Sequence, residues 1–477
     1  MTEEERKRQR RILGILGFFI LVSLVTYGYH EYYVYLSAYL WFGIVYGMSL
    51  QYGRFCFASA FRDLFAVKVT RMAVGIMVSM IFFGLVVAFV NILGMSPFEP
   101  APVGYYQIIA GFIFGIGMVL AGGCASGSLY KAAEGSGASM LVLLSISVSQ
   151  SVFVDIGGIT NSLVPRSWTE SAAAKGLPPQ VTATDGWMDQ YLAGYVWDFP
   201  TLTFASLMGW SDKSLAGAFL ANWLLGVVVP ASILLLVGYI VCARKPFLAR
   251  RRRERRDRSG GLATELAGYW SMVVASKRTI IGGVVLGIAA GVHMIVLRGL
   301  QVKFGVENFG ELMTRMGITF GLSIKGTVFD PGYWYITTQE AQWVGWVFQK
   351  LGWENLDNIF YGFNNGIPNP LINPADWMTI GLLGGAAITA LYSAEFKWKK
   401  PTVELAVWAI LGGTLMGIGS RLGLGCNVGA FFIRISNGNP AGWLFGIGMI
   451  AGAFIGVQFF NWWTERKLAQ AMAPLEV

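Results

Sequence analysis

Charged residues, histidines and cysteines are all scarce in this sequence. Only 13% of the 477 residues are Asp, Glu, Lys or Arg, whereas a soluble domain carries about 25%. The two histidines, His30 and His293, and the four cysteines form no Cys-x-x-Cys pair and no cluster with zinc spacing. The sequence therefore predicts no metal site, no dithiol redox centre and no cofactor.

Apolar residues, glycine and tryptophan are abundant instead. Hydrophobic residues make up 55% of the chain, the mean hydropathy is +0.54, and there are 61 glycines and 17 tryptophans. Glycine lets membrane helices approach closely, and tryptophan gathers at bilayer interfaces. This composition predicts an all-α polytopic membrane protein. Residues 1–11 are charged and precede an apolar run without an A-x-A cleavage site, which predicts an uncleaved first span.

The net charge of +9 comes mainly from one basic segment, residues 244–258, which lies between apolar runs. A cytoplasmic loop that obeys the positive-inside rule explains this segment better than a nucleic-acid site does. We therefore expect the lipid bilayer, and no nucleic acid, as a partner of the chain.

Apolar runs of roughly 20 residues predict about 9 to 11 transmembrane helices. The ten full runs are 12–29, 34–52, 72–93, 105–121, 138–154, 214–242, 279–297, 377–393, 403–419 and 443–463. A further run, 312–324, is too short to cross and is expected to form a re-entrant hairpin. Residues 261–276 are expected to lie along the membrane surface.

An internal repeat organises these spans. Gly122-Gly123-Cys124-Ala125-Ser126-Gly127 follows one apolar run, and Gly425-Cys426-Asn427-Val428-Gly429 follows another. In both copies a Gly-Ile-Gly triplet begins nine residues before the cysteine, and a glycine lies three positions after it. This repetition indicates two related halves with a cysteine turn in each.

A second pair of segments supports the repeat. Residues 47–56 resemble residues 321–330, with Asp330 standing where Cys56 stands. Asp330 either starts a turn with Pro331 and Gly332 or titrates during proton coupling, and the turn is the favoured interpretation.

These boundaries divide the chain into five parts. Residues 1–33 hold an N-terminal tail and the first span, and 34–154 hold the first repeat. Residues 155–277 hold an outer loop, a linker span and the basic loop. The second repeat covers 278–464, with an aromatic insert at 325–374, and 465–477 form a C-terminal tail. If the basic segments face the cytoplasm, the Cys124 turn enters from the inside and the Cys426 turn from the outside, an inverted arrangement typical of transporters.

Glycine-flanked breaks within the bilayer suit the binding of an anion. They direct helix N-termini, which attract anions, toward a cavity. A neutral thiol adds a weak S–H donor and a polarisable sulfur, which suits a soft, sulfur-bearing anion. The candidate pathway residues are Cys56, Cys124, Cys426, Gly122, Gly123, Ser126, Gly425 and Asn427.

Five cations lie near these turns and could guide an anion: Arg54, Arg62, Lys131, Arg421 and Arg434. Arg54, Lys131 and Arg421 are the candidate electrostatic guides. We expect Glu134 to pair with Lys131, which lies one helical turn before it. Cys242, at a helix end beside the basic segment, is interpreted as a small buried residue, and His293 as a packing residue.

Three segments resemble the YeeE/YedE sulfur-transport family. They are Gly53-Arg54-Phe55-Cys56-Phe57, the hexapeptide around Cys124, and Gly425-Cys426-Asn427. The resemblance implies thiosulfate uptake by an hourglass-shaped inverted repeat with re-entrant helices, and some members of the family are linked to selenium metabolism. By motif match, Cys56, Cys124 and Cys426 would pass thiosulfate along by S–H contacts. The chain departs from the family in its inserts, 155–213 and 325–374.

The sequence thus predicts a multi-pass transporter of the cytoplasmic (inner) membrane, not an enzyme, that takes up thiosulfate or a related sulfur-containing anion past neutral thiols. A carrier of a selenium compound is one alternative. Another is a membrane thiol enzyme that passes sulfane sulfur to a sulfur-accepting cytoplasmic protein, which requires a second cysteine near the first. A membrane anchor subunit for a partner complex is the third.

Overall fold

The computed structural model describes residues 2–95, 103–155, 196–197, 215–253, 261–306, 309–318, 336–352, 367, 369–423 and 425–472. Within these residues the chain is helical apart from turns and one pair of two-residue antiparallel strands, β1 (Val103–Gly104) and β2 (Val196–Trp197). The predicted all-α class is confirmed. The segment 321–330, with Asp330, and most of both inserts lie outside the described residues.

Among the described residues, the first half of the chain has eight helical segments. They are α1 (Glu3–Tyr29), η1 (Glu31–Tyr33), α2 (Val34–Gly53), α3 (Phe57–Val67), α4 (Arg71–Ile92), α5 (Tyr106–Leu120), α6 (Ala125–Ala133) and α7 (Gly137–Asp155). A connecting unit follows, made of α12 (Leu215–Trp223), η3 (Leu224–Val228), α13 (Val229–Gly238), η4 (Tyr239–Ala243), α14 (Arg244–Arg253) and α15 (Leu262–Ala275).

The part of the second half that the structure describes has eight further helical segments. They are α16 (Lys277–Phe304), α17 (Phe309–Arg315), α18 (Ile336–Lys350), α19 (Pro374–Tyr392), α20 (Val403–Leu422), η7 (Asn427–Ile433), α21 (Arg434–Ser436) and α22 (Ala441–Met472).

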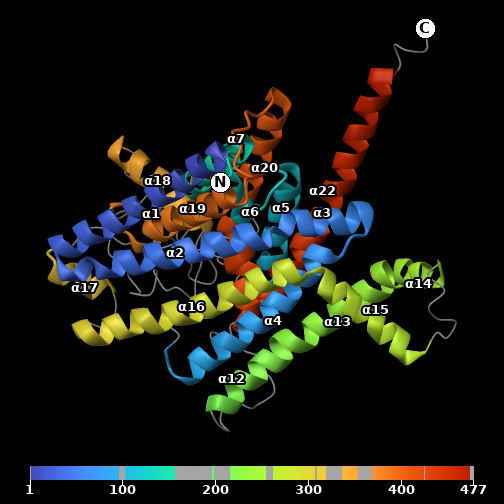
Figure 1. The fold of residues 1–477 in the computed structure, drawn as a ribbon, viewed down its shortest axis with the longest axis horizontal. Coiled ribbons are helices and arrows are strands. Elements are labelled where there is room, and N and C mark those ends of the chain that lie inside the picture. The colour runs from blue at the N-terminus through green and yellow to red at the C-terminus, as the bar shows by residue number, and fades with distance from the viewer. Residues whose placement is uncertain are drawn as a thin grey trace, which may run out of the picture.

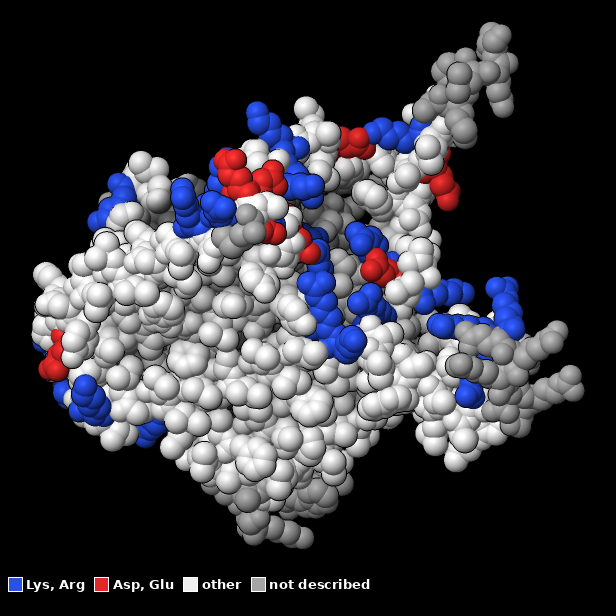
Figure 2. All heavy atoms as spheres, viewed as in Figure 1, with Lys and Arg blue, Asp and Glu red and all other residues white. Residues whose placement is uncertain are grey.

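Eight of the ten predicted spans coincide with helices that are long and apolar enough to cross a membrane. The other two predictions fall on α7, whose apolar stretch is shorter, and on α19. Figure 2 shows a broad uncharged surface, with Lys, Arg, Asp and Glu along the upper edge, at the left end, right of the centre and over the α14–α15 arm. This distribution fits a multi-pass membrane protein.

The most extensive helix contacts each join a helix of the first half to a helix of the second half. In Figure 1, α2 runs beside α16, and α4 crosses below them. Helix α2 packs along α19 as α16 packs along α4, and α5 packs along α22 as α20 packs along α7. Matching α2 to α16, α4 to α19, α5 to α20 and α7 to α22 therefore maps each of these contacts onto another. This pattern supports two related halves, while their opposite orientation in the bilayer stays a prediction.

Glycines allow these helix pairs to touch. A Cβ atom on Gly47 of α2 would lie 1.9 Å from the carbonyl oxygen of Leu382 in α19, and one on Gly448 of α22 would lie 2.0 Å from that of Ile108 in α5. No side chain fits at such a separation, so the backbones are in direct contact. The high glycine content is therefore a packing requirement of the fold.

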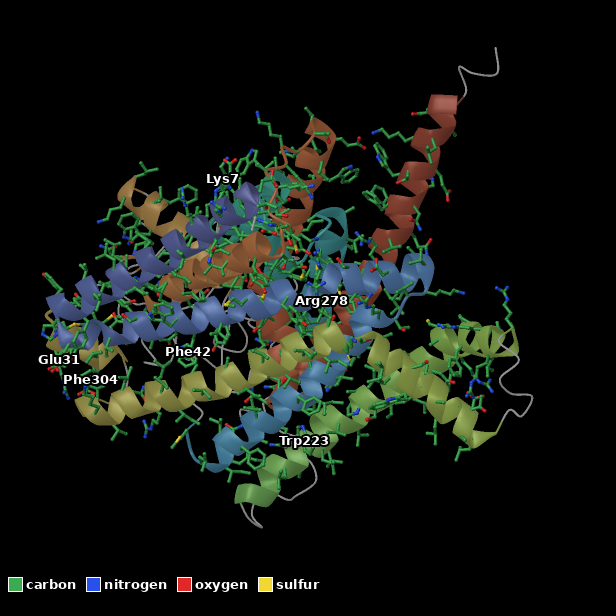
Figure 3. The ribbon with its side chains drawn as sticks, in the orientation of Figure 1. Lys7, Glu31, Phe42, Trp223, Arg278 and Phe304 are labelled. Carbon is green, nitrogen blue, oxygen red and sulfur yellow. The ribbon has the colours of Figure 1, made fainter. Side chains whose placement is uncertain are left out.

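Polar side chains form hydrogen bonds to backbone carbonyls of neighbouring helices, both at the helix ends and in the connecting unit. Arg278, at the start of α16, donates to the carbonyl of Tyr52 at the end of α2 over 2.7 Å, and Trp223 of α12 donates to the carbonyl of Ile81 in α4 over 2.8 Å (Figure 3). His293 is buried, bonded to the Tyr46 hydroxyl at 2.9 Å, and stacked on Phe42. The histidine thus packs between α2 and α16.

Candidate functional site

Each of the three motif cysteines caps the start of a helix. Cys56 precedes α3, Cys124 precedes α6 and Cys426 precedes η7, and all three have extended backbones and buried side chains. The sulfur of Cys124 accepts from the Gly127 amide at 3.4 Å, and that of Cys426 from the Val428 amide at 3.4 Å. The thiols therefore lie at the positive ends of helices.

The turns before these cysteines use backbone angles that favour glycine. Gly122 has φ +67° and Gly425 has φ +151°, a region that side chains with a Cβ rarely enter. The chain can therefore stop one helix and start the next within a few residues, as the glycine-flanked motifs predict. Arg54, at φ +53°, ends α2 in the left-handed region without glycine.

Cys56 and Cys124 meet in the folded chain. Their sulfur atoms lie 3.8 Å apart, and both are free thiols. Gly127 lies against the pair, because a Cβ on it would be 2.6 Å from the Cys56 sulfur and 3.3 Å from the Cys124 sulfur. The glycine three positions after the cysteine is thus what leaves room for the second thiol.

The cysteine turns of the two halves also touch. Ser126 Oγ lies 3.5 Å from the Cys124 sulfur, and Asn427 Nδ2 donates to the same Oγ at 3.5 Å. Ser126 and Asn427 are both fully buried. Cys124, Ser126 and Asn427 therefore form a continuous polar chain that ends beside Cys426.

Aromatic rings enclose this polar chain. Phe55 packs edge-on against Phe432, and Phe57 packs edge-on against Phe431, at centroid distances of 5.5 and 5.7 Å. Both pairs join a residue next to Cys56 with a residue of η7. The thiols thus lie among aromatic rings, with the Ser126 hydroxyl and the Asn427 amide as the neighbouring polar groups.

The three candidate guides differ in their positions. Lys131 donates to the carbonyl of Gly122 over 3.0 Å and lies close enough to act electrostatically on Cys56. Arg421 is buried in the last turn of α20. Arg54 is half-exposed and forms an ion pair with Glu395 at 2.5 Å, so its side chain lies at the protein surface and not among the buried thiols. Of the three candidates, Lys131 is therefore the one within electrostatic range of Cys56.

The predicted pair of Lys131 with Glu134 is wrong. Glu134 accepts instead from Gln51, at the end of α2, and Gln51 also reaches Glu395. The lysine turns the other way because the break after α5 exposes backbone carbonyls near it, and a cation stabilises such a helix end. Sequence spacing alone offered no sign of Gln51 or Glu395 at this place.

The second half repeats the lysine's role with an arginine. Arg434 is buried in α21, and its Nη1 donates to the carbonyl of Gly423 over 2.9 Å. In each half, a cation that follows the cysteine by about two helical turns binds a carbonyl just before that cysteine. The repeat itself is the signal that could have identified this pair.

No group of three or more His, Cys, Asp or Glu side chains that could hold a metal ion occurs in the described part of the chain. Its geometry offers thiol, hydroxyl and amide donors, helix N-termini and one nearby lysine. Because most of these donors are uncharged, they can bind a small anion weakly enough to release it again.

Comparison with known proteins gives a concordant result. A family model described as "Sulphur transport" matches residues 52–455. The thiosulfate transporter TsuA of Spirochaeta thermophila is 26% identical over 416 residues, which cover 86% of this chain and 94% of that protein. The probable transporter YedE of Escherichia coli is 34% identical over 142 residues, 30% of this chain and 34% of that one. The thiosulfate transporter TsuA of Escherichia coli is 35% identical over 111 residues, 23% and 32% of the two chains.

Proposed function

The chain belongs to the sulphur transport family, and from this premise we propose that it takes up thiosulfate, or a closely related sulfur-containing anion, across the cytoplasmic membrane. The transported anion would pass between neutral thiols. The observation that carries the proposal is the 3.8 Å approach of Cys56 and Cys124, joined through Ser126 to Asn427 of the other half. The names of two relatives, both thiosulfate transporters, support the substrate class.

The geometry suits the chemistry of thiosulfate. This anion has one soft terminal sulfur and three hard oxygens. The thiols of Cys56 and Cys124 offer S–H donors and polarisable surface to the sulfur, while the Ser126 hydroxyl and the Asn427 amide offer harder donors to the oxygens. Because none of these donors is charged, the anion is held without being trapped. Lys131 supplies the nearest positive charge on the side of the thiol pair.

We propose that Cys426 and the thiol pair act in succession along one pathway. Cys426 caps η7 in the second half, and the pair lies at the starts of α3 and α6 in the first half. If the halves are oppositely oriented, Cys426 faces the outside first, and the thiol pair passes the anion inward. No covalent bond to sulfur is required in this scheme.

The experiment is uptake of radiolabelled thiosulfate into proteoliposomes. Cys124→Ala and Cys426→Ala are expected to abolish saturable uptake while the protein still inserts, and Cys242→Ala is the matched control that retains uptake. Competition by thiosulfate analogues but not by sulfate would support a thiol-lined path. Absence of uptake by well-folded wild-type protein would refute the thiosulfate assignment, and block by selenite would favour the selenium alternative.

A membrane thiol enzyme is a second candidate that one observation favours. The 3.8 Å distance supplies the adjacent second thiol that passing sulfane sulfur to a cytoplasmic acceptor protein would need. Both sulfurs are fully buried, however, so an acceptor could not reach them without an opening of the fold. Mass spectrometry after thiosulfate exposure separates the two, because an obligatory persulfide or thiosulfonate adduct is expected only of the enzyme.

A further inference from the structure

A buried carboxyl lies beside the second-half thiol. Glu340 belongs to α18, is only 4% exposed, and neither of its carboxyl oxygens has a hydrogen-bond partner among the described residues. One turn earlier in the same helix, the backbone of Thr337 contacts the sulfur of Cys426, and Glu340 lies close enough to act on that thiol electrostatically. An unsatisfied buried acid therefore lies within electrostatic range of Cys426.

Among the described residues, the elements that pack against α18 supply no counter-charge to this carboxyl. Helix α18 packs against α7, α19 and α6. From α7, the described buried polar side chains are all uncharged: Ser139, Ser147, Gln150 and Ser151. From α19, Asp376 is a second buried acid, next to Trp343 and Asn373.

The charged residues of α6 bind partners other than Glu340. Lys131 binds the carbonyl of Gly122, and Glu134 accepts from Gln51. Among the described pathway residues, Cys426 is thus the one on which Glu340 acts electrostatically, and it carries no charge as a thiol.

An ionised carboxylate in this position would be strongly unfavourable. It would be buried without hydrogen bonds, and an anion passing Cys426 would repel it at close range in a low dielectric. A protonated carboxyl removes both penalties. It also gains one O–H donor, and because no described protein group accepts from it, that donor is free for the anion.

We propose that Glu340 couples thiosulfate movement to a proton. The carboxyl binds one proton before the anion reaches Cys426, donates its O–H to an anion oxygen there, and releases the same proton after the anion has moved on to the Cys56–Cys124 pair. The inference rests on the proposed function, because it assigns the coupling ion of that same pathway. One proton enters and one proton leaves in each cycle, so no other reactant is needed.

The test separates this inference from the proposed function. Proteoliposomes containing wild-type protein are first assayed for thiosulfate counterflow at equal pH on both sides, and absence of counterflow would count against thiosulfate transport itself. Net uptake is then measured with an imposed inward proton gradient, and lumenal acidification is followed with a trapped pH dye. Each pH unit of gradient supports about tenfold accumulation per proton moved.

Glu340→Gln keeps a neutral donor of similar shape. It is expected to retain counterflow but to lose both the response of uptake to the gradient and the thiosulfate-dependent acidification. Asp376→Asn is the matched control, a neighbouring buried acid whose replacement is expected to leave the gradient response intact. The proposal would be overturned if wild-type uptake did not respond to the proton gradient, or if Glu340→Gln kept that response. It would also be overturned if Asp376→Asn, and not Glu340→Gln, lost the response.

Discussion

Replacing Gly127 by alanine is the most direct test of the thiol pair. The added Cβ would lie 2.6 Å from the Cys56 sulfur and 3.3 Å from the Cys124 sulfur. Ordinary contact begins at 3.4 Å, so the Cys56 sulfur must retreat by at least 0.8 Å, the difference between 3.4 and 2.6. Cys56 is itself enclosed by aromatic rings, so the displacement will separate the two sulfurs.

The effect on folding and the effect on transport should differ in size. Alanine is favoured over glycine within a helix by about 1 kcal/mol, which offsets part of the roughly 1–3 kcal/mol that overpacking costs. We therefore expect stability in detergent to change little. A displacement approaching 1 Å at a site of positioned donors can cost on the order of 100-fold in rate, so thiosulfate uptake should fall by tenfold or more.

The assay is initial-rate uptake into proteoliposomes, normalised to correctly inserted protein. Gly14→Ala is the control, because no atom within 4 Å would meet a Cβ at that position of α1. Gly127→Ala protein that folds, inserts and transports at the wild-type rate would refute the argument that these two thiols must lie together.

Three further perturbations test individual contacts of the structure. Lys131→Met removes the cation nearest the thiol pair and should raise the apparent KM for thiosulfate about tenfold, equivalent to about 1.4 kcal/mol, whereas an unchanged KM would exclude Lys131 as a guide. Gly47→Leu should prevent α2 from packing on a backbone carbonyl of α19, because a Cβ would lie 1.9 Å from it, and gel filtration should show loss of the folded species. Arg244 pairs with Glu265 at 2.7 Å and lowers the pKa of that carboxyl, so the pair stabilises the α14–α15 arm at neutral pH and its contribution is lost as the pH falls below about 4. The protection of α15 amides against hydrogen exchange, relative to the intrinsic exchange rate at each pH, should fall at that acidic pH in the wild type. In Arg244→Gln it should already be lower at neutral pH, and equal protection in the two proteins at neutral pH would refute this role.

Several features could be read directly from the sequence because they depend on local pattern. Hydropathy predicted most of the helices, although α1 begins nine residues before its expected apolar run and α22 ends nine residues after its own. Helix α18 lies within residues 325–374, which were expected only as an insert. Glycine on either side of Cys124 and Cys426 predicted turns at which one helix stops and another starts, and the structure has those turns. These predictions succeed because the bilayer length and the φ angles of glycine act within a few residues.

Side-chain partners were predicted less well. The i, i+3 rule paired Glu134 with Lys131, but two tertiary partners, Gln51 and the Gly122 carbonyl, took their places. The role of Glu340 could not be recognised either, since a glutamate in an amphipathic segment normally faces water and only packing shows that this one is buried.

The sequence by itself determined the class of the protein, the positions of its helices and the three cysteines that begin a helix, because each depends on neighbouring residues. Only the tertiary structure decided that Cys56 meets Cys124, 68 residues away, and that Asn427 meets Ser126, 301 residues away. Those meetings follow from glycine-mediated contact between helices of the two halves, α2 with α19 and α5 with α22. The shape of one helix against another is not encoded in any single segment, so the thiols become a site only when the halves pack.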